Sequence, residues 1–212
     1  MRIAFIDGGT YYHHATYHDP QWQHCFDGNI YVRDLPTADL SGYDCLYIAS
    51  RQDPAELQKA QAAIQAFLAA GKMVVALGES HALPWIESVD WTTGETNFWW
   101  WLTPGADSGL RQVNPDHGLF SYLTLQDATW HRHGTLAVPN GAESLIDAVE
   151  GGSVLYDDRV STAGRLLVST LDPCYHHGSY FMPATTRFLR GFIPWLKAGA
   201  PTKNQGLDAP VQ

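Results

Sequence analysis

Three separate stretches of the sequence concentrate histidine and acidic side chains, the residue types that exchange protons near neutral pH. The first is residues 7–18, the second residues 78–81 and the third residues 171–180. Imidazoles and carboxylates that share a site can act as proton donor and acceptor in one reaction. We therefore predict acid–base chemistry, and the candidate catalytic residues are Glu79, His177, His13, His14 and Asp172.

Glu79 is the first of these candidates. It follows Gly78 at the start of a segment after an apolar strand, where backbone N–H groups favour an anion. The alternative roles for Glu79 are an N-cap or a salt bridge to Arg51. Asp172 also has an alternative, because Asp-Pro is a common turn dipeptide. Residues expected to bind a ligand around these groups are Asp7, Gly8, Gly9, Gly78, His81, Cys174, Tyr175, His176, Trp99 and Trp100.

Imidazole and carboxylate groups also suit zinc, iron or manganese. His14 and His18 have the spacing of two ligands on one helical face, but they lie in a Tyr-rich stretch that we expect to be a loop. We therefore predict no cofactor. A divalent metal, if one binds, would use His13, His14 and His18.

Cys174 is a candidate for a displaced nucleophile, with His176 or His177 as its base. The spacing of these residues does not fix their geometry, because a histidine two or three residues along a loop need not face the thiol. The alternative is an inert buried cysteine, which is a common state of free thiols in proteins.

The segment from residue 43 to residue 81 predicts its own structure most directly. Residues 45–49 form an apolar run typical of a strand that is covered on both faces. Asp53-Pro54 indicates a helix start, and Gly71 suits the left-handed position that ends a helix. Residues 73–77 form a second apolar strand, so the segment predicts a parallel strand–helix–strand unit.

The second strand of this unit ends in Ala76-Leu77-Gly78-Glu79-Ser80-His81. In α/β enzymes, a turn between a strand end and a helix start presents a nucleophile beside backbone N–H groups. Gly78 stands at the nucleophile position and has no side chain. We therefore expect the three histidine-containing and acidic stretches to converge at this edge of the sheet, around a turn without an attacking group.

The remaining sequence predicts one α/β domain over residues 1–200 and a tail over residues 201–212. Further strands are expected at residues 2–7, 29–32, 135–138, 153–156 and 165–170, and a closing helix at residues 183–197. Residues 82–133 are rich in Gly, Pro, Thr and Trp, which predicts an insertion or lid. Three consecutive tryptophans at residues 99–101 cannot all face one core, so at least one should lie near a ligand or a subunit partner in a homo-oligomer.

Composition narrows the classes of function. The net charge is −9 and there is no Lys/Arg-rich run, which argues against a nucleic-acid partner. No apolar stretch approaches the roughly 18 residues of a membrane span. Residues 2–6 enter a strand directly, without the pattern of a signal peptide, and the three cysteines have no paired spacing. We therefore expect a cytoplasmic protein whose partner is a small molecule.

The order of strand, helix and elbow resembles the class I glutamine amidotransferase-like superfamily, over residues 1–81 and 135–197. The elbow of that superfamily reads Gly-x-Cys-x-Gly-His, and here Gly78 takes the place of the cysteine while His81 fits. Its glycine-rich oxyanion loop falls on residues 49–52, and its late His-Pro-Glu falls on Asp172-Pro173-Cys174. The resemblance implies a flavodoxin-like, doubly wound, mostly parallel sheet, here with a Trp-rich insertion, and no glutaminase activity.

Within this superfamily the chain is more similar to the ThuA-like (trehalose-utilisation) branch. The shared features are His13-His14, the strand at residues 164–168, His176-His177-Gly178 and Trp195-Leu196 near the end. This resemblance implies carbohydrate-related chemistry. Together with the histidine and acidic residues, it predicts a protein that binds or transforms a small polar ligand, most simply a sugar derivative, by His/Glu acid–base chemistry. The alternatives are a non-catalytic binding or assembly module that uses the Trp-rich insertion, and a metal-dependent hydrolase.

Overall fold

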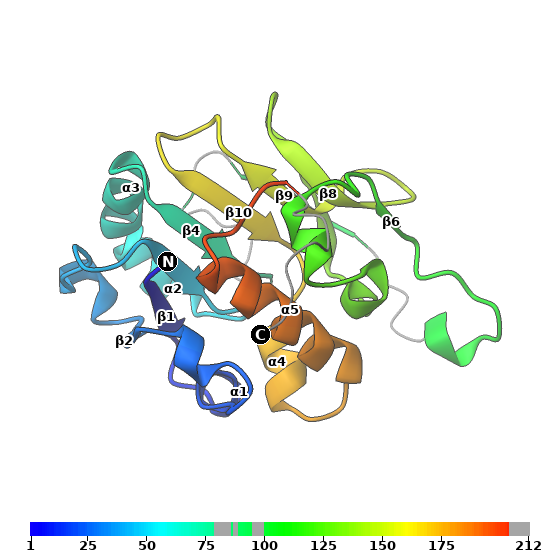
Figure 1. Ribbon diagram of the computed structural model, residues 1–212, viewed down its shortest axis with the longest axis horizontal. Coiled ribbons are helices and arrows are strands. Elements are labelled where there is room, and N and C mark those ends of the chain that lie inside the picture. Colours follow the sequence, from blue (N-terminus) through cyan, green and yellow to red (C-terminus); the bar gives the residue numbers. More distant parts are fainter. Residues whose placement is uncertain (79–85, 87–88, 95–99, 204–212) are drawn as a thin grey trace, which may run out of the picture.

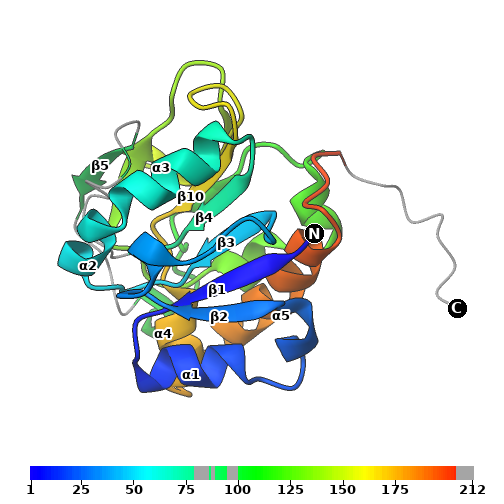
Figure 2. The same ribbon diagram turned by 90° about the vertical axis from the view of Figure 1, so that its left-hand side faces the viewer.

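A computed structural model of the chain describes residues 1–78, 86, 89–94 and 100–203. Within these residues, ten strands form one mixed sheet, and helices lie on both of its faces (Figures 1 and 2). Five neighbouring strands run parallel in the order β2 (Gly28–Tyr31), β1 (Ile3–Asp7), β3 (Cys45–Ile48), β4 (Met73–Ala76) and β10 (Arg165–Ser169). Antiparallel strands continue the sheet: β9 (Ser153–Asp158), β8 (Glu143–Ala148), β7 (Gly134–Ala137), β6 (Leu110–Gln112) and β5 (Asp90–Thr93).

The parallel strands are apolar along their length because both of their faces are covered. One row across β1, β3, β4 and β10 faces one side and belongs to one core cluster: Phe5, Tyr47, Val75 and Leu167. The row beside it faces the opposite side and belongs to a second cluster: Ala4, Leu46, Val74 and Leu166. Fully burying one large apolar side chain contributes about 1.5–3 kcal/mol, so the two clusters hold the layers together.

Helices α1 (Tyr11–Tyr17), α4 (Pro173–Gly178) and α5 (Pro183–Lys197) cover the face of the first cluster. Helices α2 (Pro54–Lys59) and α3 (Gln61–Ala69) cover the other face, and Figure 2 shows the sheet between these two layers. None of the helices in the described part of the chain combines the length and the apolar character that crossing a membrane requires.

The strand–helix–strand unit predicted over residues 43–81 is confirmed in β3, α2, α3 and β4. The Asp53 carboxylate accepts the Ala55 N–H at 2.8 Å as an N-cap, and Gly71 has a φ of 78° after α3. One difference is that the single expected helix divides at Ala60 into α2 and α3. The closing helix has the predicted bounds, Pro183–Lys197.

Two stretches that we expected to be loops are short helices. Thr10 is the N-cap of α1, so His14 and His18 face each other across one helical turn, with ring centroids 4.3 Å apart. Pro173 occupies the first turn of α4, where proline is favoured, so Asp172-Pro173 begins a helix rather than a simple turn.

The segment at residues 82–133 is only partly the surface insertion that we expected. Its described residues include β5 and β6, and several of its apolar side chains are buried in the same cluster as α5. Trp130, for example, is 1% exposed and packs edge-on against Phe188 of α5, with ring centroids 5.5 Å apart. Together with β8, these elements lack a strong periodic pattern and depend on long-range packing.

Candidate active site

Three loops meet where the parallel strands β3, β4 and β10 end. The Arg51 N–H donates to the carbonyl of Gly78 at 3.0 Å, and the Gly78 N–H donates to the carbonyl of Leu171 at 2.9 Å. These backbone bonds join the loop after β3 to the residues that follow β4 and β10. Open α/β sheets bind ligands at this carboxyl edge. The predicted meeting of the second and third stretches is therefore confirmed at Gly78.

Asp172 is the centre of this edge, and its side chain is fully buried. One carboxylate oxygen accepts the Arg51 Nε–H at 2.8 Å, and the other accepts the Trp130 Nε1–H at 3.3 Å. Two histidines lie close to the same carboxylate: His176 Nε2 is 3.1 Å from Oδ1, and His133 Nε2 is 3.8 Å from Oδ2. The ring of His131 stands beside that of His176, with centroids 4.4 Å apart.

The charges around Asp172 determine its ionisation. Burial by itself raises the pKa of Asp172, but the contact with His176 and the charges of Arg51 and His133 lower that pKa below its ordinary value. Asp172 is therefore ionised at neutral pH. Burial lowers the pKa of His131 to about 4, and the neighbouring His176 acts in the same direction. His131 is therefore uncharged at neutral pH.

Arg51 connects this carboxylate to the surrounding loops. Its backbone has a φ of 62°, a left-handed conformation that costs a non-glycine residue about 1–3 kcal/mol. Its guanidinium carbon lies 3.7 Å from the ring centroid of Tyr175, and its carbonyl accepts the hydroxyl of Tyr12. These contacts and the bond to Asp172 hold the strained residue in place. Such strain is concentrated at functional sites.

His176 has an unusual environment for a buried histidine. The residue is 1% exposed, and neither of its ring nitrogens has a hydrogen-bond partner among the described residues. Nε2 is near Asp172, but the direction of the ring does not give a hydrogen bond. The rings of His131 and Phe181 flank the imidazole, with centroids 4.4 and 4.8 Å away.

His13 is buried, and its contacts are those of a structural residue, which do not favour its predicted role in proton transfer. The Gly8 N–H donates to Nδ1 at 2.9 Å, and Nε2 therefore carries the proton and donates to the Ser50 carbonyl at 2.8 Å. Both ring nitrogens of this buried histidine are thus used by backbone. Asp7 accepts the Gly9 N–H at 2.7 Å and lies 3.6 Å from His13, so these residues brace the loop after β1.

His14 and His18 are exposed on the surface of α1, whereas His13 is buried beneath it. The three predicted metal ligands therefore do not face one point. Of the three histidines, His14 and His18 form an exposed pair on one face of the helix, and His13 is not part of it.

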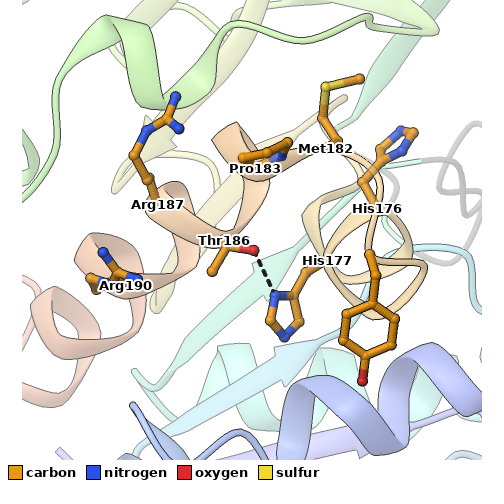
Figure 3. A pocket seen from close by; sticks show the side chains of 8 residues that line it. His176, His177, Met182, Pro183, Thr186, Arg187 and Arg190 are labelled. Carbon is orange, nitrogen blue, oxygen red and sulfur yellow. Dashed lines mark hydrogen bonds between the residues drawn. The ribbon is translucent and has the colours of Figure 1, made fainter.

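His177 is turned away from Asp172 and fixed by other partners. Its Nδ1 lies 2.9 Å from the Thr186 hydroxyl and its Nε2 3.3 Å from the Asp19 carboxylate. Burial lowers the pKa of His177, while Asp19 opposes this shift. Figure 3 shows His176 and His177 pointing in different directions from α4. Both line a cavity of about 390 Å³, together with Tyr180, Met182, Pro183, Thr186, Arg187 and Arg190.

Two positions lack the nucleophile that an amidotransferase would need. Cys174 is fully buried, its Sγ lies 3.4 Å from the Tyr47 hydroxyl, and burial raises the pKa of the thiol, so it stays protonated. At Gly78, a Cβ would lie 2.3 Å from the carbonyl oxygen of Thr170. The burial of Cys174 favours the alternative of an unreactive thiol over that of a displaced nucleophile, and the turn at Gly78 has no room for a side chain.

Several predicted residues lie outside the described residues, namely Glu79, His81 and Trp99. Trp100 is half-buried in a short 3-10 turn, and Tyr175 contributes the ring beneath Arg51. Sequence reasoning missed Trp130, His131 and His133. It considered Arg51 as a partner of Glu79 and as part of the stretch that corresponds to the oxyanion loop, but not as a partner of Asp172. The signal in the sequence that could have indicated the missed histidines is His131-Arg132-His133, directly before β7.

A second histidine–acid cluster lies in the antiparallel part of the sheet. Within each cluster, the possible ligand atoms of three residues lie within 4.8 Å of one another: His131, Asp172 and His176 in the first, and His117, Glu143 and Asp157 in the second. In the second cluster, the Leu119 N–H donates to His117 Nδ1, so Nε2 donates to Asp157 at 3.2 Å. Arg165 binds both oxygens of Asp157, at 2.9 and 2.8 Å.

No family model matches the chain, and no curated protein does. Among solved structures, the chain is similar to the exo-beta-1,4-mannosidase Op5Man5 from Opitutaceae bacterium strain TAV5, with a TM-score of 0.48 and 16% identity. The match covers 95% of this chain and 36% of the mannosidase chain, so the chain spans about a third of that neighbour's length. A likeness of this degree carries no conclusion about function.

Proposed function

We propose that this chain is a flavodoxin-like, doubly wound domain of the ThuA-like branch and acts as a hydrolase- or lyase-type enzyme on a small polar ligand. Two observations support the fold assignment. The parallel strand order β2-β1-β3-β4-β10 corresponds to the 2-1-3-4-5 order of flavodoxin-like sheets. Helices also cover both faces of these strands.

The observation that carries the proposal is the buried, ionised Asp172 with histidines beside it at the carboxyl edge of the sheet. A buried carboxylate beside imidazoles stabilises the positive charge that develops on them during proton transfer. His176 and His131 take the role that the sequence suggested for His13 and His14. Glu79 remains the proposed carboxylate partner, since it follows Gly78 in the sequence.

The cavity beside His176 supports a sugar derivative as the ligand. Tyr180 lines this cavity and is 83% exposed, and an exposed ring of this kind stacks on the apolar C–H face of a sugar. Thr186 and the two arginines of α5 add hydrogen-bonding groups to the lining. The combination of a few polar groups with aromatic and apolar walls is usual for small-molecule sites.

A ligand screen by thermal shift tests the proposal, with sugars, keto-sugars and amino acids as the compounds. A true ligand should raise the unfolding temperature of the wild-type protein by mass action, and turnover of that ligand should then be measurable. His176→Asn should abolish turnover, whereas the surface variant His14→Asn should retain it. Full turnover by His176→Asn would remove the assignment of this centre.

A further inference from the structure

We propose that His131, Asp172 and His176 together bind one divalent transition-metal cation. The proposal rests on the proposed function only for the catalytic use of the ion, because binding can be tested without a substrate. It also differs from the sequence-based expectation in its ligands, since it uses neither His13 nor the surface pair His14 and His18.

The spacing of the ligand atoms fits such an ion. All three residues offer a ligand atom within 4.8 Å of the others, and all three are buried. The Asp172 Oδ1 and His176 Nε2 atoms are 3.1 Å apart. Two ligands held at about 2.0–2.1 Å from a tetrahedral zinc ion are separated by roughly 3.3 Å. The observed separation is therefore close to that of two ligands of one metal.

His176 supplies the second, independent observation. Its imidazole is almost completely buried, yet both nitrogens lack a hydrogen-bond partner among the residues that the structure describes. Buried polar groups are nearly always satisfied, and an exception calls for an explanation such as an ion. Here Nε2 lies 3.1 Å from a carboxylate oxygen without meeting the geometry of a hydrogen bond, and such a close pair is what two ligands of one ion form.

The second cluster shows why residue types alone do not define a metal site. His117 is hydrogen-bonded at both nitrogens, and the guanidinium of Arg165 occupies both oxygens of Asp157. A cation would have to displace that guanidinium. In the Asp172 cluster, the Arg51 Nε–H donates to Oδ2, as an outer partner of a metal-ligating carboxylate does. Oδ1 accepts the longer bond from the neutral Trp130 indole N–H and lies 3.1 Å from His176 Nε2, so no cation has to be displaced from it.

The ligand set predicts the kind of ion and its use. Two imidazoles and one carboxylate suit zinc or another first-row divalent ion better than calcium or magnesium. Three protein ligands leave at least one coordination position open, which is the pattern of catalytic rather than structural zinc sites. When bound, such an ion would supply an acidic water molecule. The imidazole of His133 lies beside the same carboxylate, with Nε2 3.8 Å from Asp172 Oδ2.

The test uses the purified full chain, stripped with a chelator and titrated with Zn²⁺ by calorimetry and with Co²⁺ by visible absorption. We expect one equivalent of tight binding and a rise in the unfolding temperature with Zn²⁺. His176→Ala should weaken Zn²⁺ binding by more than about 100-fold, the upper range for loss of an outer partner. His131→Ala should have a similar effect and serves as the second variant if His176→Ala does not fold.

Two control variants separate this site from adventitious binding. His14→Ala removes the exposed helical pair, and His177→Ala removes the neighbouring histidine of α4; both should leave the tight site intact. Absence of tight binding, its loss in His14→Ala, or its survival in both His176→Ala and His131→Ala would overturn the proposal. Tight Zn²⁺ binding without any ligand or turnover would instead count against the proposed function alone.

Discussion

The clusters around Asp157 and Asp172 contain similar residues but differ in what their polar atoms already contact. Asp157 lies within β9, and its two oxygens are bound by Arg165 of the adjacent strand β10. Asp172 lies beyond the end of β10, where arginine binds only one oxygen. A histidine–acid cluster whose atoms are all paired stabilises the fold. A cluster with an imidazole that lacks a hydrogen-bond partner among the described residues can bind a ligand or a metal ion.

The location of each cluster reinforces this difference. Arg165 also donates to the carbonyl of Ala200, so the Asp157 cluster connects the antiparallel strands to the segment after α5. The Asp172 cluster instead joins loops at the carboxyl edge of the parallel strands, where substitutions alter the packing of loops rather than the sheet itself. We therefore expect the first cluster to dominate stability and the second to dominate ligand and metal binding.

Asp157→Asn should produce the largest loss of stability. It leaves the buried His117 and the partly buried Arg165 without their anion, and breaking a buried pair in this way costs about 3–5 kcal/mol. Urea denaturation would measure the change in the free energy of unfolding. Asp107→Asn, in the exposed Asp107–Arg111 pair, is the matched control and should not change it measurably. Equal stability of the two variants would contradict the structural role of Asp157.

Gly78→Ala should have the next largest effect, because the added Cβ would lie 2.3 Å from the Thr170 carbonyl oxygen and 2.7 Å from that of Leu171. Overpacking of this kind costs about 1–3 kcal/mol. The shift would also displace Asp172, so Zn²⁺ affinity should fall. Gly94→Ala is the control, since its nearest atom would be 3.8 Å away. A Gly78→Ala protein as stable as Gly94→Ala would show that the loops can separate.

Acid should destabilise the protein through Asp157. Burial raises the pKa of Asp157, but the hydrogen bonds from His117 and Arg165 and their charges lower it overall, with Arg159 also nearby. The ionised form therefore stabilises the fold above the unfolded pKa of about 3.9, and this contribution is lost as pH falls through the depressed folded value. Each unit of difference corresponds to about 1.4 kcal/mol. Urea titrations over an acidic pH series should show a steeper loss for the wild type than for Asp157→Asn.

Local signals in the sequence account for much of the parallel part of the fold. The Asp53 N-cap, the Gly71 turn and the apolar strands around them act within a few residues, so their patterns could be recognised. Asp172 meets Arg51 across 121 positions and Trp130 across 42, and no periodic pattern records such contacts. The general location of the site at the sheet edge could therefore be predicted, whereas most of its histidines could not.

The smallest effect on stability is expected for His176→Leu in metal-free protein. The His176 imidazole is buried and has no hydrogen bond to any other described residue. Replacing it with an apolar side chain of similar size removes a desolvation cost and should change the free energy of unfolding by less than about 1 kcal/mol. His117→Leu is the direct counterpart. It leaves the Leu119 N–H without its acceptor and removes one hydrogen bond to Asp157. The free energy of unfolding should therefore fall by about 1–3 kcal/mol.

Adding Zn²⁺ should change the stability of these two variants by different amounts. His117→Leu should still gain stability from the ion, because its Asp172 cluster is unchanged, while His176→Leu should gain none. Thermal unfolding with and without Zn²⁺ measures both responses in one experiment. If His176→Leu were the less stable protein without metal, or were stabilised by Zn²⁺ as strongly as His117→Leu, His176 would have to be a structural residue, and the distinction between the two clusters would fail.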